Sequence, residues 1–198
     1  MSDRPLTVGV LALQGAFIEH INVLKNLGVD VYEIRQKSDL EARHYDGLVL
    51  PGGESTTQSN LLKKVGLFND IQKLIEDGTP VLATCAGAIL LSEKVAGGEK
   101  HFGTLPVSIK RNAYGRQLGS FITKGSFGEY VDVPMNFIRA PYFEKVNNPE
   151  VKVLSTIQDK IVAVQYNNQI AMSFHPEVTG DDRVHKYFID EMKHGVAI

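Results

Sequence analysis

The first half of the chain alternates short apolar runs with amphipathic stretches, which limits the possible fold more than any other feature. Residues 6–13 (LTVGVLAL) are aliphatic on both faces, as in a buried strand, and a helical pattern at 17–27 ends before Gly28. Further strands are predicted at 29–34, 47–50 and 80–84, and a second helix at 67–76. Buried strands that alternate with helices predict an α/β fold in which helices cover both faces of a parallel sheet, a three-layer α/β/α sandwich.

The second half is richer in strands. Strand patterns are found at 105–110, 120–124, 137–140, 151–156, 160–166 and 169–174. We expect these to add antiparallel strands to the sheet and to form a smaller sheet nearby. A last helix is predicted at 181–194, and its N-terminal end is rich in Asp. No repeat or linker interrupts the pattern, so residues 1–198 are predicted to form a single domain.

Composition excludes several classes of function. The 198 residues are 43% hydrophobic and 22% charged, with a net charge of -2 and no long basic run, so binding to nucleic acid or anionic membrane is not expected. No segment approaches the roughly 20 apolar residues of a membrane span, and the start lacks a secretory signal. The single cysteine excludes internal disulfides, and no histidine pair has metal-ligand spacing. We therefore expect a cytoplasmic protein without a metal site.

Cys85 lies in VLATCAGAILL, where a predicted strand leads through small residues into a helical pattern. A sharp strand-to-helix turn of this kind presents its central side chain at the carboxyl edge of the sheet. The start of a helix also stabilises a thiolate through its free N–H groups and its dipole. Cys85 is therefore a candidate nucleophile. The alternative is a structural cysteine, because free cysteines are among the most buried residues.

His175 and Glu177 follow a predicted strand in the segment SFHPE. Residues two apart in an extended segment point to the same side, and Pro176 favours extended geometry at His175. Glu177 could then accept a hydrogen bond from one imidazole nitrogen while the other nitrogen faces a thiol, as in a catalytic triad. The alternative is a capping pair before the last helix. The other histidines are interpreted as structural or solvated: His20, His44, His101, His185 and His194.

The segment PGGESTT follows the third predicted strand. Glycines at 52 and 53 can expose backbone N–H groups, which an oxyanion intermediate at Cys85 would need. The segment lacks the Gly-Lys-Ser/Thr ending of a phosphate loop. The alternative is a simple strand-to-helix turn capped by Ser55 or Thr56.

PGGES, TCAG and HPE, in this order, resemble the class I (triad) glutamine amidotransferases, which have a flavodoxin-like mixed sheet. GVLALQGAFIEH, PGGESTT, TCAGAILL, RNAYGRQ, FIRAP and SFHPE resemble more closely the glutaminase subunits of pyridoxal 5′-phosphate synthase. Three features differ from that family's pattern or match it poorly. Ala83 stands where Gly is common, Tyr114 stands where Phe is usual, and residues 125–134 match least well, so we assign them no role.

The resemblance implies a role for each matching residue. Cys85 would be the nucleophile, His175 the general base and acid, and Glu177 the carboxylate that orients it. Backbone N–H groups of Gly53 and Ala86 would stabilise the oxyanion. The residues implied to bind glutamine are Gly53, Glu54, Ser55, Arg111, Ile138 and Arg139. An amino-acid substrate does need charged partners, although the two arginines could also be ordinary surface residues.

The resemblance also implies a reaction and a partner. The chain would hydrolyse L-glutamine to L-glutamate and ammonia, and would pass the ammonia to a (β/α)8 synthase subunit that makes pyridoxal 5′-phosphate. Gln14 would lie towards that partner or the ammonia channel. The isolated chain would have low activity until docking organises residues 51–53. Two rival hypotheses remain at this point. They are a cysteine-elbow hydrolase or deglycase, which would lack the His-Pro-Glu segment, and a catalytically silent flavodoxin-like binding module.

Overall fold

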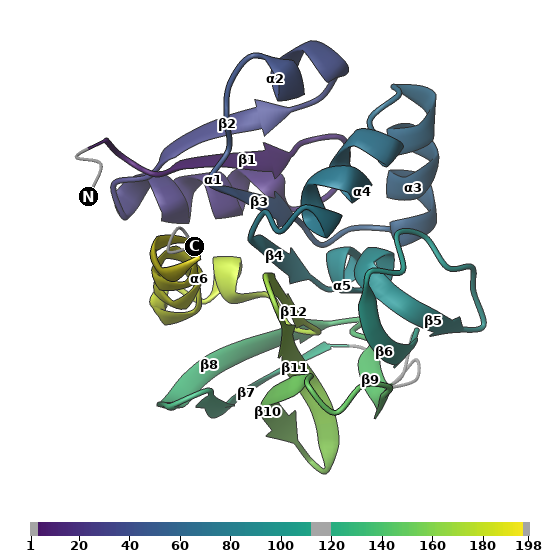
Figure 1. Cartoon of the computed structure of the whole chain (residues 1–198). Helices are drawn as coiled ribbons and strands as arrows, with labels where there is room; N and C mark the ends of the chain where they lie inside the picture. Colours follow the sequence, from purple (N-terminus) through teal and green to yellow (C-terminus); the bar gives the residue numbers. More distant parts are fainter. Residues whose placement is uncertain (1–3, 112–119, 196–198) are drawn as a thin grey trace.

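A computed structural model describes residues 4–111 and 120–195 of the chain (Figure 1). The strands are β1 (Thr7–Leu11), β2 (Asp30–Ile34), β3 (Gly47–Leu50), β4 (Val81–Thr84), β5 (Ser92–Ala96), β6 (Leu105–Lys110), β7 (Ser120–Phe127), β8 (Tyr130–Ile138), β9 (Tyr142–Val146), β10 (Lys152–Ile157), β11 (Lys160–Tyr166) and β12 (Gln169–Met172). The helices are α1 (Phe17–Asn26), α2 (Lys37–Glu41), α3 (Ser55–Lys64), α4 (Phe68–Glu76), α5 (Ala86–Leu91) and α6 (Arg183–His194), and Pro176–Val178 form a 3-10 turn, η1.

Within the described residues, ten strands form one mixed sheet in the order β2-β1-β3-β4-β12-β11-β9-β6-β5, with β10 paired to β11. The strands β1 to β4 are parallel, and β12 joins β4 in the same direction with Ala171 opposite Ala83. The next strand, β11, is antiparallel to β12. The carboxyl ends of β3, β4 and β12 therefore meet at one edge, and the segments that follow them contain Gly52, Cys85 and His175.

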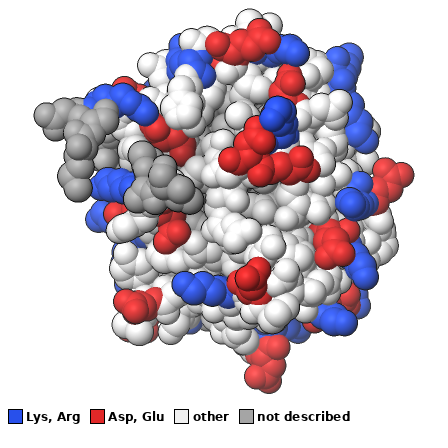
Figure 2. Space-filling model, viewed as in Figure 1, with Lys and Arg blue, Asp and Glu red and all other residues white. Residues whose placement is uncertain are grey.

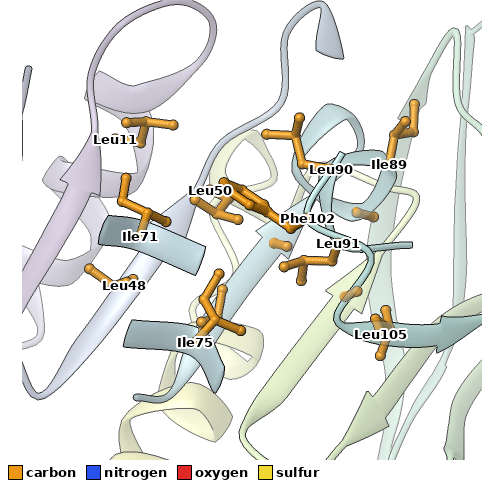
Figure 3. Packing of buried hydrophobic residues seen from close by; sticks show 14 of the residues in the cluster. Leu11, Leu48, Leu50, Ile71, Ile75, Ile89, Leu90, Leu91, Phe102 and Leu105 are labelled. Atoms are coloured by element: carbon orange, nitrogen blue, oxygen red, sulfur yellow. The ribbon is translucent and has the colours of Figure 1, made fainter. Parts of the chain in front are cut away.

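Helices cover both faces of this sheet, which confirms the predicted three-layer α/β/α arrangement. The helices α3, α4 and α5 pack on one face, where Ile71, Leu90 and Phe102 belong to a continuous apolar cluster (Figure 3). The helices α1 and α6, together with the separate β7–β8 hairpin, pack on the other face through a second cluster that includes Leu24, Phe137 and Phe188. The sheet edge at which β3, β4 and β12 end is therefore held between packed layers on both faces.

Close approach between layers requires glycine at specific positions. A Cβ atom on Gly47 of β3 would overlap with Phe188 and Met192 of α6, so glycine at this position allows α6 to lie directly on the strand. Val184, Phe188 and Met192 recur every four residues and are all buried, so they form an apolar stripe on this helix. The helix therefore packs along one side only.

The elements predicted from periodicity are present, with differences in both halves of the chain. The strand predicted at 137–140 is instead β8, which begins at Tyr130 and ends at Ile138, because Arg139 has a positive φ of 46° that stops the extended run. Residues 125–134 lie largely in the β7–β8 hairpin, where Lys124 pairs with Pro134. The elements α2, β5 and β9 were not predicted, and α3 was considered only in the alternative of a strand-to-helix turn capped by Ser55 or Thr56. The RNAYGRQ block, including Tyr114, lies outside the described residues beyond Arg111.

The surface agrees with the modest net charge. On the face shown in Figure 2, basic and acidic side chains are interspersed and neither sign forms a continuous patch. Among the residues that the structure describes, no helix is both long enough and apolar enough to cross a bilayer.

Candidate active site

Cys85 stands at a sharp turn between β4 and α5. Its φ of 48° and ψ of −102° lie outside the usual regions for a residue with a side chain, a strain of order 1–3 kcal/mol that surrounding structure must hold. The backbone N–H of Cys85 donates to the carbonyl of Met172 in β12, at 2.8 Å, which fixes the turn to the sheet. A Cβ atom on Gly87 would overlap with the carbonyl of Leu50, so this glycine lets α5 fold back against β3.

His175 and Glu177 come to the same edge after β12. The Nδ1 atom of His175 lies 2.6 Å from Oε1 of Glu177, and both residues are buried. The predicted pairing is present, but its predicted cause is wrong. Pro176 starts the 3-10 turn η1, so the two side chains meet across a turn and not along an extended segment.

The electrostatics of His175 are strongly perturbed. Burial lowers the pKa of His175, but hydrogen-bonding interactions with Cys85 and Glu177, and the charges of both groups, outweigh burial and raise this pKa to about 10. The imidazolium form is therefore favoured near neutral pH. A cation beside the sulfur of Cys85 is the arrangement that stabilises a thiolate nucleophile.

The loop after β3 lies against His175. A Cβ atom on Gly52 would overlap with Cε1 of the His175 ring, so only glycine fits here without displacing the imidazole. The carbonyl of Gly52 accepts a hydrogen bond from the N–H of Ala16 at 3.0 Å. The side chain of Gln14 accepts one from the N–H of Glu54 at 2.9 Å. The segment after β1 therefore holds this loop in place.

Glu54 is the cap of α3, in place of the Ser55 or Thr56 cap considered from the sequence. Its carboxylate accepts hydrogen bonds from the N–H groups of Thr56 and Thr57 and pairs with Arg111 at 3.0 Å. Burial raises the pKa of Glu54, but these hydrogen bonds and Arg111 outweigh it and lower the pKa to about 2. Ser55 is buried and its hydroxyl has no partner among the described residues.

These residues surround one cavity of about 480 Å³, a volume typical of small-molecule sites. Its lining includes Cys85 and His175 and all six residues expected to bind glutamine: Gly53, Glu54, Ser55, Arg111, Ile138 and Arg139. Gly52, considered in the sequence analysis as a source of exposed N–H groups, also lines the cavity, and three further lining residues were not identified there: Ala16, Ile89 and Pro141. Glu177 lies behind His175, outside the lining. Ala86, the other expected oxyanion donor, is the first residue of α5, where backbone N–H groups have no helical partner.

Two histidines that we interpreted as structural or solvated are buried behind Glu177. Nε2 of His20 lies 3.5 Å from Oε2 of Glu177, and His185 contacts the other side of the His20 ring. A signal for their burial exists in the sequence, because His20 shares the apolar helical face of Ile21 and Leu24. Among the described residues, no group of three or more His, Cys, Asp or Glu side chains could hold a metal ion.

Comparison with known proteins identifies the family. The model of the SNO glutamine amidotransferase family matches residues 10–194. A pyridoxal 5′-phosphate synthase subunit PdxT from Desulfitobacterium hafniense is 53% identical, and the alignment covers 96% of this chain and 95% of the relative. Subunits of the same name from Methanocorpusculum labreanum and Haemophilus influenzae are 50% and 44% identical over 93% and 95% of this chain and 97% and 99% of the relatives.

Solved structures agree with the sequence relatives. A crystal structure of a glutamine amidotransferase has a TM-score of 0.87 at 40% identity, covering 94% of this chain and 98% of that chain. A glutamine amidotransferase from Thermotoga maritima, at 16% identity and a TM-score of 0.63, covers 98% of this chain and 87% of that chain and shares the fold. From the family match and the identity of these relatives, we conclude that the chain belongs to the SNO glutamine amidotransferase family.

Proposed function

We propose that this chain hydrolyses L-glutamine to L-glutamate and ammonia, with Cys85 as nucleophile, His175 as general base and acid, and Glu177 as the carboxylate that orients His175. The observation that carries this proposal is the linked series of these three side chains, of which Cys85 and His175 line a cavity together with suitable binding groups and Glu177 lies behind His175. Membership of a glutamine amidotransferase family supports the substrate and the reaction. A cysteine-elbow hydrolase or a silent binding module would not require the paired His175 and Glu177.

The chemistry follows from the positions of the atoms. The Cys85 thiolate attacks the side-chain amide carbon of glutamine and forms a C–S bond, while the carbonyl oxygen becomes an oxyanion. His175 gives its proton to the amide nitrogen, the C–N bond breaks, and ammonia leaves a thioester on Cys85. His175 then takes a proton from water, which attacks the thioester. The C–S bond then breaks, which restores the Cys85 thiolate beside protonated His175, and the released γ-carboxylic acid loses its proton to water as glutamate leaves.

Backbone groups and charged side chains would stabilise and orient the reactants. We propose the N–H groups of Gly53 and Ala86 as oxyanion donors, because Gly53 lines the cavity and Ala86 follows the nucleophile as the first residue of α5, where an N–H group has no partner within the helix. Arg111 and Arg139 supply cations for an α-carboxylate, and Glu54 supplies an anion for an ammonium group. Ser55 and Ile138 line the same space.

We also propose a partner chain. The relatives are named as subunits of pyridoxal 5′-phosphate synthase, which supports an ammonia-consuming synthase chain as the partner, and we propose that this partner is a (β/α)8 barrel. Free ammonia in water near neutral pH becomes mostly ammonium, which is not a nucleophile, so a sheltered path between the chains is required. Docking would organise residues 51–53, and a cytoplasmic location fits this chemistry.

Glutamate release should be measured for the chain alone and with the synthase subunit from the same organism. We expect low release from the chain alone and a large increase in the complex, because docking completes the oxyanion site. Replacing Cys85 with Ala should abolish release while leaving thermal unfolding and binding to the synthase intact. Unchanged turnover in the C85A complex would reject the triad, and full activity without the synthase would reject activation by docking.

The single cysteine allows a second, independent measurement. A glutamine-like electrophile such as 6-diazo-5-oxo-L-norleucine should add one adduct to the full chain in the complex, detectable by mass spectrometry on the peptide containing Cys85. Excess L-glutamine should slow this labelling, whereas D-glutamine at the same concentration should not. Equal protection by both enantiomers would contradict a specific L-glutamine site.

A further inference from the structure

Two buried histidines lie directly behind the proposed triad, and the proposed mechanism gives them no role. His20 projects from α1 and His185 from α6, and neither side chain has any exposure to solvent. Histidine is uncommon at fully buried positions, because each ring nitrogen needs a hydrogen-bond partner there. Their surroundings therefore require an explanation.

The two rings connect the nucleophile turn to the carboxylate. Nδ1 of His20 lies 2.9 Å from Nε2 of His185. On the other side of the His20 ring, Nε2 lies 3.2 Å from the hydroxyl of Thr84 and 3.5 Å from Oε2 of Glu177. Thr84 precedes Cys85, so this chain of contacts joins α6, α1, the end of β4 and the η1 turn.

Both rings are neutral at ordinary pH. Burial lowers the pKa of His20 well below its usual value, and the nearby His185 and His175 lower it further. Burial also lowers the pKa of His185, to about 4, although Asp182 opposes this effect. A neutral imidazole carries one N–H group, so each ring donates from one nitrogen and accepts at the other.

The contacts distinguish the two possible arrangements of these protons. If His20 carried its proton on Nδ1, it would donate to Nε2 of His185, and His185 would have to carry its own proton on Nδ1. That atom is buried without a partner among the described residues, so an N–H group would be left unsatisfied. The lone pair on Nε2 of His20 would also face the carboxylate of Glu177. Both consequences are unfavourable.

The opposite arrangement avoids both problems. His185 then donates from Nε2 to Nδ1 of His20, and His20 directs its Nε2–H group between the Thr84 hydroxyl and Oε2 of Glu177. The atom left without a partner is only an acceptor, Nδ1 of His185. Oε2 of Glu177, which otherwise has no hydrogen-bond partner among the described residues, gains a polar N–H group pointing towards it.

We propose that His20, held in its Nε2–H tautomer by His185, is a positioning residue that orients Glu177 and, through Glu177, His175. This proposal rests on the proposed glutaminase function. Oε1 of Glu177 holds the catalytic imidazole, and His20 holds the opposite oxygen, so the carboxylate cannot rotate freely about its last bond. Groups that contact a functional side chain, but not the substrate, commonly fix the orientation of that side chain.

The tautomer can be measured directly. In the full-length chain labelled with ¹⁵N-histidine, two-bond ¹H–¹⁵N correlations distinguish a protonated Nδ1 from a protonated Nε2. At pH 7 we expect neutral rings with Nε2–H for both His20 and His185, assigned by loss of each signal in single variants. An Nδ1–H tautomer or a charged ring at His20 would overturn the proposal, whether or not the chain hydrolyses glutamine.

Kinetics with two matched variants test the positioning role in the complex with the synthase. The amide nitrogen of Gln falls near the place of imidazole Nε2, whereas the amide of Asn falls near Nδ1. His20→Asn should therefore lower kcat by about 10-fold to 100-fold, as losses of outer-sphere partners do, with KM for glutamine changed by less than about threefold. His20→Gln restores a donor towards Glu177 and should recover most of this loss.

The control is His44→Asn, because the His44 side chain is 79% exposed and outside the cavity. This variant should have the wild-type kcat. Equal kcat values for His20→Asn and His20→Gln, or a rise in KM with kcat unchanged, would overturn the positioning role. If the proposed function itself were wrong, the wild-type complex would release no glutamate. The tautomer measurement does not depend on glutamate release, so it would still test the role of His20.

Discussion

Cys85, His175 and Glu177 are 7%, 6% and 6% exposed, whereas the side chains of Glu54 and Arg111, at the same cavity, are 47% and 29% exposed. The first three, which we call the buried group, lie on segments that backbone hydrogen bonds tie to neighbouring strands, such as the bond from the N–H of Cys85 to the carbonyl of Met172 in β12. His175, for example, donates its N–H to the carbonyl of Asn136 in β8 at 2.8 Å. The position of the buried group is therefore set by the fold.

The exposed group, which consists of Glu54, Arg111, Ile138 and Arg139, is positioned more locally. Glu54 is fixed by the start of α3, and Arg111 is held mainly by its ion pair with Glu54. Exposed ion pairs contribute little to stability, about 0–1 kcal/mol, because water and salt compete with them. The difference suggests that the buried group determines turnover and the exposed group determines binding, and the following variants test that division.

The largest effect is expected for Glu177→Gln. A neutral amide cannot stabilise the imidazolium form and can present its NH₂ group to Nδ1 of His175, so kcat should fall by about 10³-fold to 10⁴-fold. The pKa of His175, about 10 in the wild type, should fall, because the hydrogen bond and the charge of Glu177 both raise it. Steady-state kinetics of the complex and NMR titration of His175 measure the two effects.

Glu93→Gln is the matched control for this variant, since Glu93 lies on β5 and outside the cavity lining. It should leave kcat and the pKa of His175 unchanged. A Glu177→Gln enzyme within tenfold of the wild-type kcat would remove Glu177 from the triad and would weaken the division between the two groups.

The next effect concerns the fit between Gly52 and the His175 ring. In Gly52→Ala the added methyl group would overlap with Cε1 of His175, so the imidazole must move. Displacements of about 1 Å at a catalytic group reduce rates by about 100-fold, which is the fall in kcat that we expect. Crystallography of the variant should show a shifted imidazole.

Gly195→Ala provides a glycine control, because Gly195 has an ordinary φ of −70° at the end of α6. It should have wild-type kinetics. A Gly52→Ala enzyme with unchanged kcat but raised KM would place Gly52 with the exposed group, contrary to the division proposed here.

The buried and exposed groups also differ in how well the sequence predicted them. Cys85 and His175 were identifiable because each follows a predicted strand: small residues allow the turn at Cys85, whereas Pro176, which we interpreted as favouring extended geometry, instead begins the η1 turn. The role of Glu54 as a helix cap was missed because Ser and Thr are stronger capping residues by local preference. The contact of His20 with Glu177 joins α1 to η1, and no local pattern encodes such a contact.

The fold was predictable to a similar extent. The strands β1, β3 and β4 are nearly all apolar and alternate with amphipathic helices, so a parallel sheet covered by helices was predictable from periodicity. The strands β5 (SEKVA) and β9 (YFEKV) carry charged residues near a sheet edge, and their short runs give no clear alternation. The strand β8 continues through Pro134, which is tolerated because its hairpin has only two strands.

A smaller effect, on binding alone, is expected for Arg111→Gln. Loss of a charged hydrogen bond to an α-carboxylate weakens binding by about 1.5–3 kcal/mol, so KM for glutamine should rise about 10-fold to 100-fold. The change in kcat should stay within about threefold, because the reacting atoms are not contacted. Arg35→Gln, on an exposed arginine paired with Glu33, is the control. A fall in kcat with KM unchanged would place Arg111 in the reaction step and not in substrate binding.

The smallest effect is expected on stability in Glu54→Gln. The folded-state pKa of Glu54, about 2, is below the ordinary value of 4.5, so its ionised form stabilises the fold above about pH 4.5 and that contribution is lost as pH falls towards 2. Because the side chain is 47% exposed and Gln can still accept a capping hydrogen bond, the loss at pH 7 should be only about 0.5–1 kcal/mol. Urea unfolding at pH 7, 5 and 3 should show the difference between wild type and variant shrinking at the lowest pH. If the difference in free energy of unfolding between wild type and variant grew as the pH fell, the surroundings of Glu54 would destabilise its ionised form. The exposed group would then be strained, a property that we assign only to Cys85.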